Sequence, residues 1–123
     1  MTSSRALTAA EFRCLHDFLG LPVSWIAQYL NVSGDDVLGW GMGHSPVPTT
    51  AAVEIQSIAK MTADLVDQLA RERQWGGSLT TYRTDEAFRI ADPFGLNYPA
   101  SWHRAVAARV ADRSVDVRIE YGD

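Results

Sequence analysis

Residues 19–48 read LGLPVSWIAQYLNVSGDDVLGWGMGHSPVP, and this stretch decides the fold. Apolar residues at helical spacing occupy positions 25–30, and a short break follows at positions 31–33. A second short helix is predicted next, with Val37 and Trp40 on its inner face, and it ends in a glycine-rich segment. Two helices that meet at a short turn are typical of a helix-turn-helix, whose second helix can enter the major groove of DNA.

Local signals also predict where the helices of this region begin and end. Thr8 and Glu11 have the spacing of a capping box, which predicts a helix that starts directly after Thr8. Ser33 is a suitable N-cap for the third helix, and Gly43 is placed to end it in the left-handed conformation. The helices are expected to share a core, with these side chains facing inward: Phe12, Leu15, Phe18, Leu19, Ile26, Tyr29, Leu30, Val37 and Trp40.

The second half of the chain differs in pattern from the first. Prolines in residues 45–48 predict an extended connector, and a long helix is expected from there to about residue 74. Its apolar residues approximate a heptad stripe at Ile55, Ile58, Leu65 and Leu69, with Thr62 as an interruption. The elements expected after it are a strand at 79–83, a short helix capped by Thr84 or Asp85, a turn at 92–95, a helix from Pro99 and a half-buried strand at 115–121.

We therefore predict a mainly α fold with a small α+β C-terminal part. The expected domains are a helix-turn-helix domain at 1–48, a long connecting helix at 49–75 and a small two-stranded α+β dimerisation region at 76–123. Two strands do not make a stable sheet alone, so the last region is expected to pair across a homodimer.

The composition is that of an ordinary globular chain. The 123 residues are 46% hydrophobic and 21% charged, which is enough apolar material for a core without disulfides or metal. The net charge of −4 argues against a protein that coats nucleic acid non-specifically. No segment has the pattern of a signal peptide or a membrane span, so we expect a cytoplasmic protein with no membrane partner. Cys14 is the only cysteine, and its apolar neighbours predict a buried, inert thiol.

No motif in the sequence points to catalysis. The acidic pairs at 35–36 and 85–86 are adjacent in sequence, so their carboxylates point apart on a helix rather than converge. The sequence has no glycine-rich phosphate loop, no nucleophile elbow and no histidine or cysteine spacing of a metal site. We predict that the protein is not an enzyme and has no catalytic residue, metal site, cofactor or small-molecule substrate.

The segment 21–48 resembles the λ repressor/Cro-like helix-turn-helix regulators. The similarity lies in the apolar helix at 25–30, the Val32–Ser33 turn, Val37 and Trp40 in the next helix, and the closing Gly43. The Ser-Pro-Val-Pro tail that follows, and the long helix after it, are most similar to YdiL-like regulators and anti-CRISPR-associated repressors. The resemblance implies a homodimer that binds an inverted-repeat operator in double-stranded DNA, as a repressor does.

The resemblance also implies which residues contact DNA. Residues 33–36 correspond to the start of the recognition helix, positions 38–39 to its outer face, and positions 44–45 to phosphate contacts. With two polar positions of the preceding helix, the predicted DNA-binding residues are Ser24, Gln28, Ser33, Gly34, Asp35, Asp36, Gly39, His44 and Ser45.

The charge of the predicted recognition helix leaves a second interpretation open. Position 35 is commonly Arg in the resembled family and is Asp here, and the helix contains no Arg or Lys. Asp35 and Asp36 can read cytosine N4 or serve only to complement the helix dipole. The alternative is a degenerate helix-turn-helix that serves as an antitoxin-like protein-interaction or dimerisation module and does not bind DNA.

Overall fold

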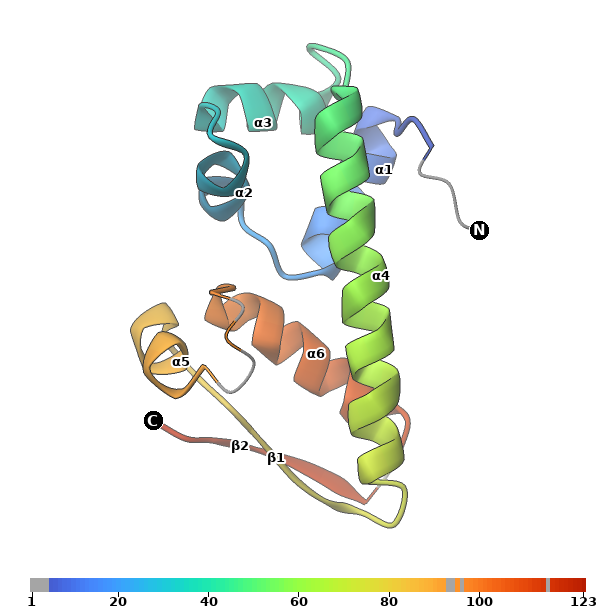
Figure 1. The fold of residues 1–123 in the computed structure, drawn as a ribbon, viewed down its shortest axis with the longest axis vertical. Helices are drawn as coiled ribbons and strands as arrows, with labels where there is room; N and C mark the ends of the chain where they lie inside the picture. Colours follow the sequence, from blue (N-terminus) through green and yellow to red (C-terminus); the bar gives the residue numbers. More distant parts are fainter. Residues whose placement is uncertain (1–4, 93–94, 96, 115) are drawn as a thin grey trace. The chain divides into compact units, whose positions relative to one another are not determined.

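A computed structural model describes residues 5–92, 95, 97–114 and 116–123 of the chain. This part is mainly helical, with a small two-stranded sheet in its C-terminal part, as predicted, and the two strands are parallel (Figure 1). The chain divides into two compact units, Met1–Met61 and Thr62–Asp123, and the boundary lies inside a long helix. Each unit is described by itself. In the described part, no helix combines the length and apolarity that a bilayer span requires.

The first unit contains three short helices and the beginning of a long one. They are α1 (Ala9–Phe18), α2 (Val23–Leu30), α3 (Gly34–Met42) and the first part of α4 (Thr49–Glu72). Helix α3 contacts both α1 and α2 (Figure 1). The predicted capping box is confirmed, because the Thr8 hydroxyl accepts from the Glu11 amide and the Glu11 carboxylate accepts from the Thr8 amide. The buried apolar residues of this unit are Phe12, Leu19, Leu21, Ile26, Ala27, Val37, Trp40, Ala51, Ala52, Ile55 and Ile58.

The prediction from the sequence placed some residues of α1 on the wrong face of the helix. The buried face of this helix carries Phe12, His16 and Leu19. Cys14 is exposed, which corrects the predicted burial, because two residues turn the helix about 200° away from Phe12. Phe18 is 56% exposed for the same reason, since it lies about 120° from the direction of Phe12. Leu15, also expected in the core, is partly buried.

Helix α2 buries a narrower face than its apolar sequence suggested. Ile26 and Ala27 are buried, whereas Leu30 is only partly buried. Tyr29, predicted to face inward, is 47% exposed. Its ring stacks on the ring of Trp25 with 4.8 Å between the ring centroids, so one face of the Tyr29 ring is covered by its own helix.

Helix α4 begins at Thr49, as expected, and ends at Glu72, about two residues earlier than predicted. Ile55, Ile58 and Leu69 of the predicted stripe are buried, but Leu65 is only partly buried. Val66, which widens the apolar face of the helix, is fully buried. The other buried residues on its C-terminal part include Thr62, whose hydroxyl accepts a hydrogen bond from Trp102 Nε1 at 3.0 Å.

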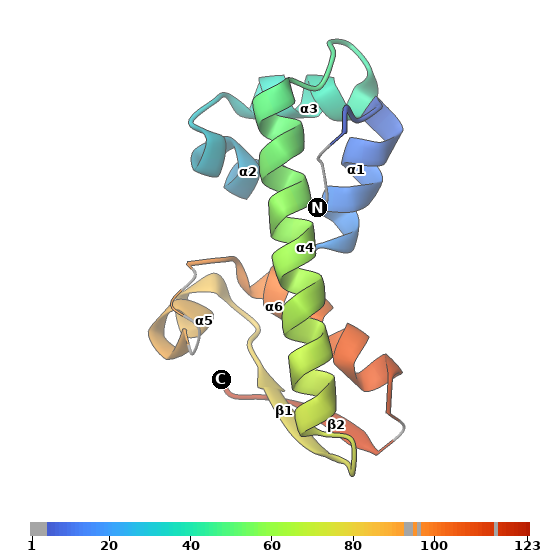
Figure 2. The same cartoon turned by 45° about the vertical axis from the view of Figure 1, so that its right-hand side comes forward.

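The second unit combines the end of α4 with two strands and two helices. Strands β1 (Gly77–Thr81) and β2 (Val117–Tyr121) pair in parallel, and Figure 2 shows them beside α6 (Ala100–Asp112). Helix α6 contacts both strands and α5 (Asp85–Ala91). The Thr84 hydroxyl caps α5 by accepting from the Ala87 amide, as predicted. The core of this unit includes Leu79, Phe88, Ala100, Trp102, Val106, Ala107, Val110 and Val117.

The second strand is less covered than its alternating sequence predicted. Val117 is buried, but Ile119 and Tyr121 are 42% and 51% exposed. Strand β2 has one strand neighbour, β1, in the described sheet, and the exposure of these three residues increases toward the C-terminal end of β2. Val115 and part of the predicted 92–95 turn lie outside the described residues.

Candidate nucleic-acid interface

The turn between α2 and α3 is fixed by its backbone conformation. Asn31 adopts the left-handed conformation (φ 57°) and ends α2, with its amide donating to the carbonyls of Ala27 and Gln28. Asparagine tolerates this conformation better than most residues. Ser33 is extended, and its hydroxyl accepts a hydrogen bond from the Asp36 amide at 3.1 Å. The next helix therefore starts immediately after the turn, as the sequence predicted.

The N-terminal end of α3 brings together one group of the predicted site residues. Ser33, Asp35 and Asp36 are exposed, and Gly34 is partly buried. The starts of α2 and α3 meet, because a Cβ at Gly34 would lie 3.9 Å from Val23 Cγ1. Ser24 and Gln28 of α2 are also exposed.

The remaining predicted residues lie at the C-terminal end of α3. Gly43 ends the helix with φ 81°, and the His44 amide donates to the Gly39 carbonyl at 2.9 Å. A Cβ at Gly39 would lie 3.4 Å from Ser45 Oγ, so the chain folds back closely over this glycine. A nine-residue helix is about 13 Å long, and the candidate set is therefore split between its two ends rather than gathered in one patch.

The charges around α3 are mostly negative. Asp35 and Asp36 lie in its first turn, where the helix dipole favours carboxylates. Arg5 pairs with Glu11 at 2.8 Å, and Arg13 pairs with Asp17 at 3.0 Å. Arg13 is the arginine beside α3, since its Cδ lies 3.7 Å from the point that a Cβ at Gly41 would occupy.

The outer surface of α3 is apolar as well as acidic. Leu38 and Met42 are 45% and 62% exposed, while Val37 and Trp40 are buried. Apolar contact with a thymine methyl or with a protein partner can each use such side chains. Neither residue was among the predicted DNA-binding residues, although Leu38 was expected on the outer face of this helix. Leu38 lies one residue after buried Val37 and Met42 two residues after buried Trp40, which turns both away from the buried face.

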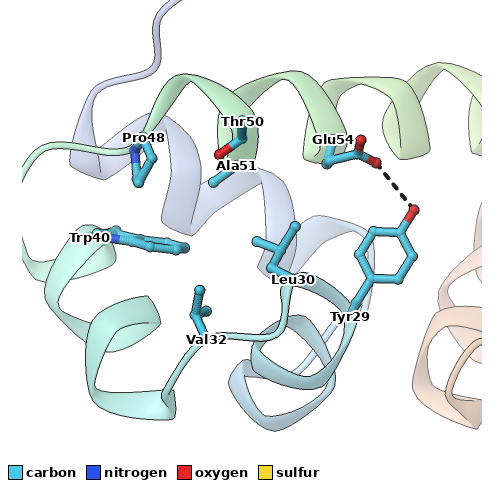
Figure 3. Close-up of a pocket in the computed structure, with 8 residues that line it drawn as sticks. All are labelled: Tyr29, Leu30, Val32, Trp40, Pro48, Thr50, Ala51 and Glu54. Carbon is cyan, nitrogen blue, oxygen red and sulfur yellow. Dashed lines mark hydrogen bonds between the residues drawn. The ribbon is translucent and has the colours of Figure 1, made fainter.

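A groove beside α3 was also missed from the sequence. The groove has a volume of about 540 Å³. Figure 3 shows the side chains that line it: Tyr29, Leu30, Val32, Trp40, Pro48, Thr50, Ala51 and Glu54. The Tyr29 hydroxyl donates to Glu54 Oε2 at 3.2 Å across its end. Partial burial raises the pKa of Tyr29, and the nearby carboxylate of Glu54 raises it further. This contact joins positions 25 residues apart, which no local pattern predicts.

The Ser33 cap gives a first test of how firmly the exposed end of α3 is held. Replacing Ser33 by alanine removes the acceptor for the Asp36 amide, so we expect Ser33→Ala to lower the free energy of unfolding by about 1 kcal/mol. Urea unfolding followed by circular dichroism measures this. Ser24→Ala is the matched control, because Ser24 is exposed and caps no helix, and its effect is expected to be near zero. Equal effects of the two substitutions would contradict the capping role.

Comparison with known proteins adds no family to this geometry. No protein-family model matches the sequence, and no curated protein matches it. In the described residues, no group of three or more histidine, cysteine, aspartate or glutamate side chains is arranged to hold a metal ion.

Proposed function

We propose that α2, the turn at residues 31–33 and α3 form a helix-turn-helix, and that the protein is a dimeric DNA-binding transcriptional regulator. In this proposal it acts as a repressor on an inverted-repeat operator, as the resemblance to λ repressor/Cro-like regulators implies. The observation that carries it is the way α3 is held. Val37 and Trp40 anchor one face of α3 in the first unit, while residues 33, 35, 36 and 38 face solvent.

A helix anchored in this way suits major-groove binding. Its N-terminal residues are the ones that a recognition helix places nearest the bases, and in a dimer two such helices would enter successive major grooves about 34 Å apart. Asp35 and Asp36 can accept from the N4 amino groups of cytosines. The backbone amides at the helix start favour an approaching phosphate.

Phosphate contacts in this proposal come from few groups. Arg13 lies along α3, and its ion pair with Asp17 is exposed on both sides, at 55% and 59%. Such pairs contribute at most about 1 kcal/mol, so Arg13 can exchange Asp17 for a phosphate. His44 and Ser45 are the other exposed candidates. Because cations are scarce here, affinity for DNA should depend only weakly on salt.

The test is binding of the purified chain to the DNA upstream of its own gene, measured by fluorescence anisotropy at several salt concentrations. We expect a log–log salt slope equivalent to about 2–4 phosphates, rather than the 6–10 of strongly basic regulators. Asp35→Arg should steepen the slope by about one per protomer and strengthen binding to unrelated DNA, which lowers sequence preference. Glu86→Arg is the matched control, because it adds the same charge at an exposed position of α5.

The regulator proposal fails if the protein at micromolar concentration, the weak end of non-specific binding, binds neither the upstream DNA nor unrelated DNA at about 50 mM salt. A protein-interaction module is then the second candidate. Its supporting observation is the outer surface of α3, where exposed Leu38 and Met42 lie on a helix with two aspartates and no cation. Such a surface suits a partner that offers an apolar groove edged by basic residues.

A further inference from the structure

Strand β2 has an open edge in the described part of the chain, because the sheet has only the order β1–β2. The parallel register places Ile119 beside Leu79 and Tyr121 beside Thr81. Paired residues of neighbouring strands project to the same face, so all four share the face of the sheet that includes the core. Leu79 and Thr81 are buried, yet Ile119 and Tyr121 are about half exposed. The inner face of the sheet thus continues to an edge that is only partly covered, where the Arg83 guanidinium lies 4.2 Å from the centroid of the Tyr121 ring.

The sequence of β2, VRIEY, is complementary to itself in the antiparallel direction. With Ile119 on a two-fold axis, Arg118 of each copy lies opposite Glu120 of the other, and Val117 lies opposite Tyr121. Opposite charges directly across two strands stabilise their pairing, and so do aromatic–aliphatic pairs. Within the described residues of a single chain, neither Arg118 nor Glu120 forms an ion pair.

Other antiparallel registers are less favourable. A shift that centres the pairing on Arg118 or on Glu120 places like charges opposite each other at the axis. A shift that moves the axis between two residues sets the apolar face of one copy against the polar face of the other. The register centred on Ile119 avoids both conflicts.

We propose that β2 pairs antiparallel with β2 of a second copy of this chain, in the register centred on Ile119. The product is a four-stranded sheet in which the exposed halves of Ile119 and Tyr121 become covered at the junction. A sheet of four strands with helices on one face also removes the weakness of an isolated two-stranded pair. The inference deepens the proposed function, since an inverted-repeat operator requires a dimer, but its test uses no DNA, so the two can fail separately.

Complementary charge reversals test both the interface and its register. In Arg118→Glu, two glutamates face each other at both ends of the pairing, and in Glu120→Arg two arginines do. We expect each variant alone to self-associate at least about 10-fold more weakly than the wild type in sedimentation equilibrium. In an equimolar mixture of the two variants, every facing pair is again of opposite charge. The mixture should therefore dimerise to within about 3-fold of the wild type.

Two controls keep the result specific. Arg89→Glu and Glu86→Arg make the same charge changes at exposed positions of α5 and should leave dimerisation unchanged. Circular dichroism establishes that each variant is folded. A wild-type chain that is monomeric at about 100 μM, above the working range of a stable dimer, would overturn the proposal. So would folded single variants that dimerise like the wild type, or a mixture that does not recover.

Discussion

Replacing Trp40 by alanine should lower the free energy of unfolding of the first unit by about 3–5 kcal/mol, which is the usual cost of removing a buried tryptophan. Trp40 is 7% exposed, and its ring meets the ring of Phe12 edge-to-face at 5.8 Å. It therefore attaches α3 to α1, while Val37 fixes the other turn of the same face. Domains are typically stable by only about 5–15 kcal/mol, so this loss is a large fraction of the total.

Urea unfolding at neutral pH, followed by far-ultraviolet circular dichroism, measures the change. Trp75→Ala is the matched control, because the same substitution at a side chain that is 90% exposed should change stability by less than about 0.5 kcal/mol. Trp40→Ala should also weaken any binding that depends on α3, because the helix loses its main anchor. A change near zero for Trp40→Ala would mean that α3 is not held by this contact, and the proposed recognition helix would lose its structural basis.

The helix boundaries of the first unit could be predicted because they are set by local chemistry. The Thr8–Glu11 capping box, the Ser33 cap and the left-handed Gly43 each depend on residues within four positions of one another. Burial of Val37 and Trp40 followed from helical spacing alone.

The prediction of burial was wrong where a helix carries more apolar residues than its neighbours can cover. Phe18 and Tyr29 are apolar enough for a core, but the faces that α1 and α2 bury are centred elsewhere. His16 is buried instead, and a hydrogen bond of 3.0 Å between its Nδ1 and the Leu21 carbonyl oxygen satisfies that ring nitrogen. The groove lined by Tyr29 and Glu54 forms between segments that are distant in sequence. The periodicity of one segment cannot predict which distant segment it contacts.

The parallel direction of the two strands also lay beyond the sequence pattern. Strands were predicted at 79–83 and 115–121 within one two-stranded unit, but the first strand lies two residues earlier, at Gly77–Thr81. Neither the parallel pairing nor the exposure of the second strand followed from the sequence. The self-complementary charges of VRIEY are visible in the sequence, but they indicate pairing between two copies only once β2 is known to lie at an open edge of the sheet.

Mild acid should destabilise the second unit because of one buried histidine. His103 is 2% exposed, its Nδ1 and the Thr81 hydroxyl share a hydrogen bond of 2.8 Å, and the ring of Phe88 lies 4.8 Å away. Burial lowers the pKa of His103 from 6.5 to about 4. Folding thus favours the neutral imidazole, and this contribution to stability is fully present above pH 6.5. It is lost as the pH falls from 6.5 toward 4.

The expected loss is about 2 kcal/mol at pH 5 and about 3 kcal/mol at pH 4, from the difference between the two pKa values. Urea unfolding between pH 7 and pH 5 measures it in a range where carboxylates stay mostly ionised. His103→Gln should be less stable at neutral pH but should show a flatter pH dependence. Part of the dependence should remain, because burial also lowers the pKa of His16.

His44→Gln is the matched control, since it makes the same substitution at an exposed position. If His103→Gln loses stability with acid as steeply as the wild type, protonation of His103 is not the cause. The acid sensitivity would then come from other groups, of which buried His16 of the first unit is the next to test by His16→Gln. If the dependence flattens in His103→Gln alone, the folded second unit requires a neutral imidazole between Thr81 and the aromatic rings around it.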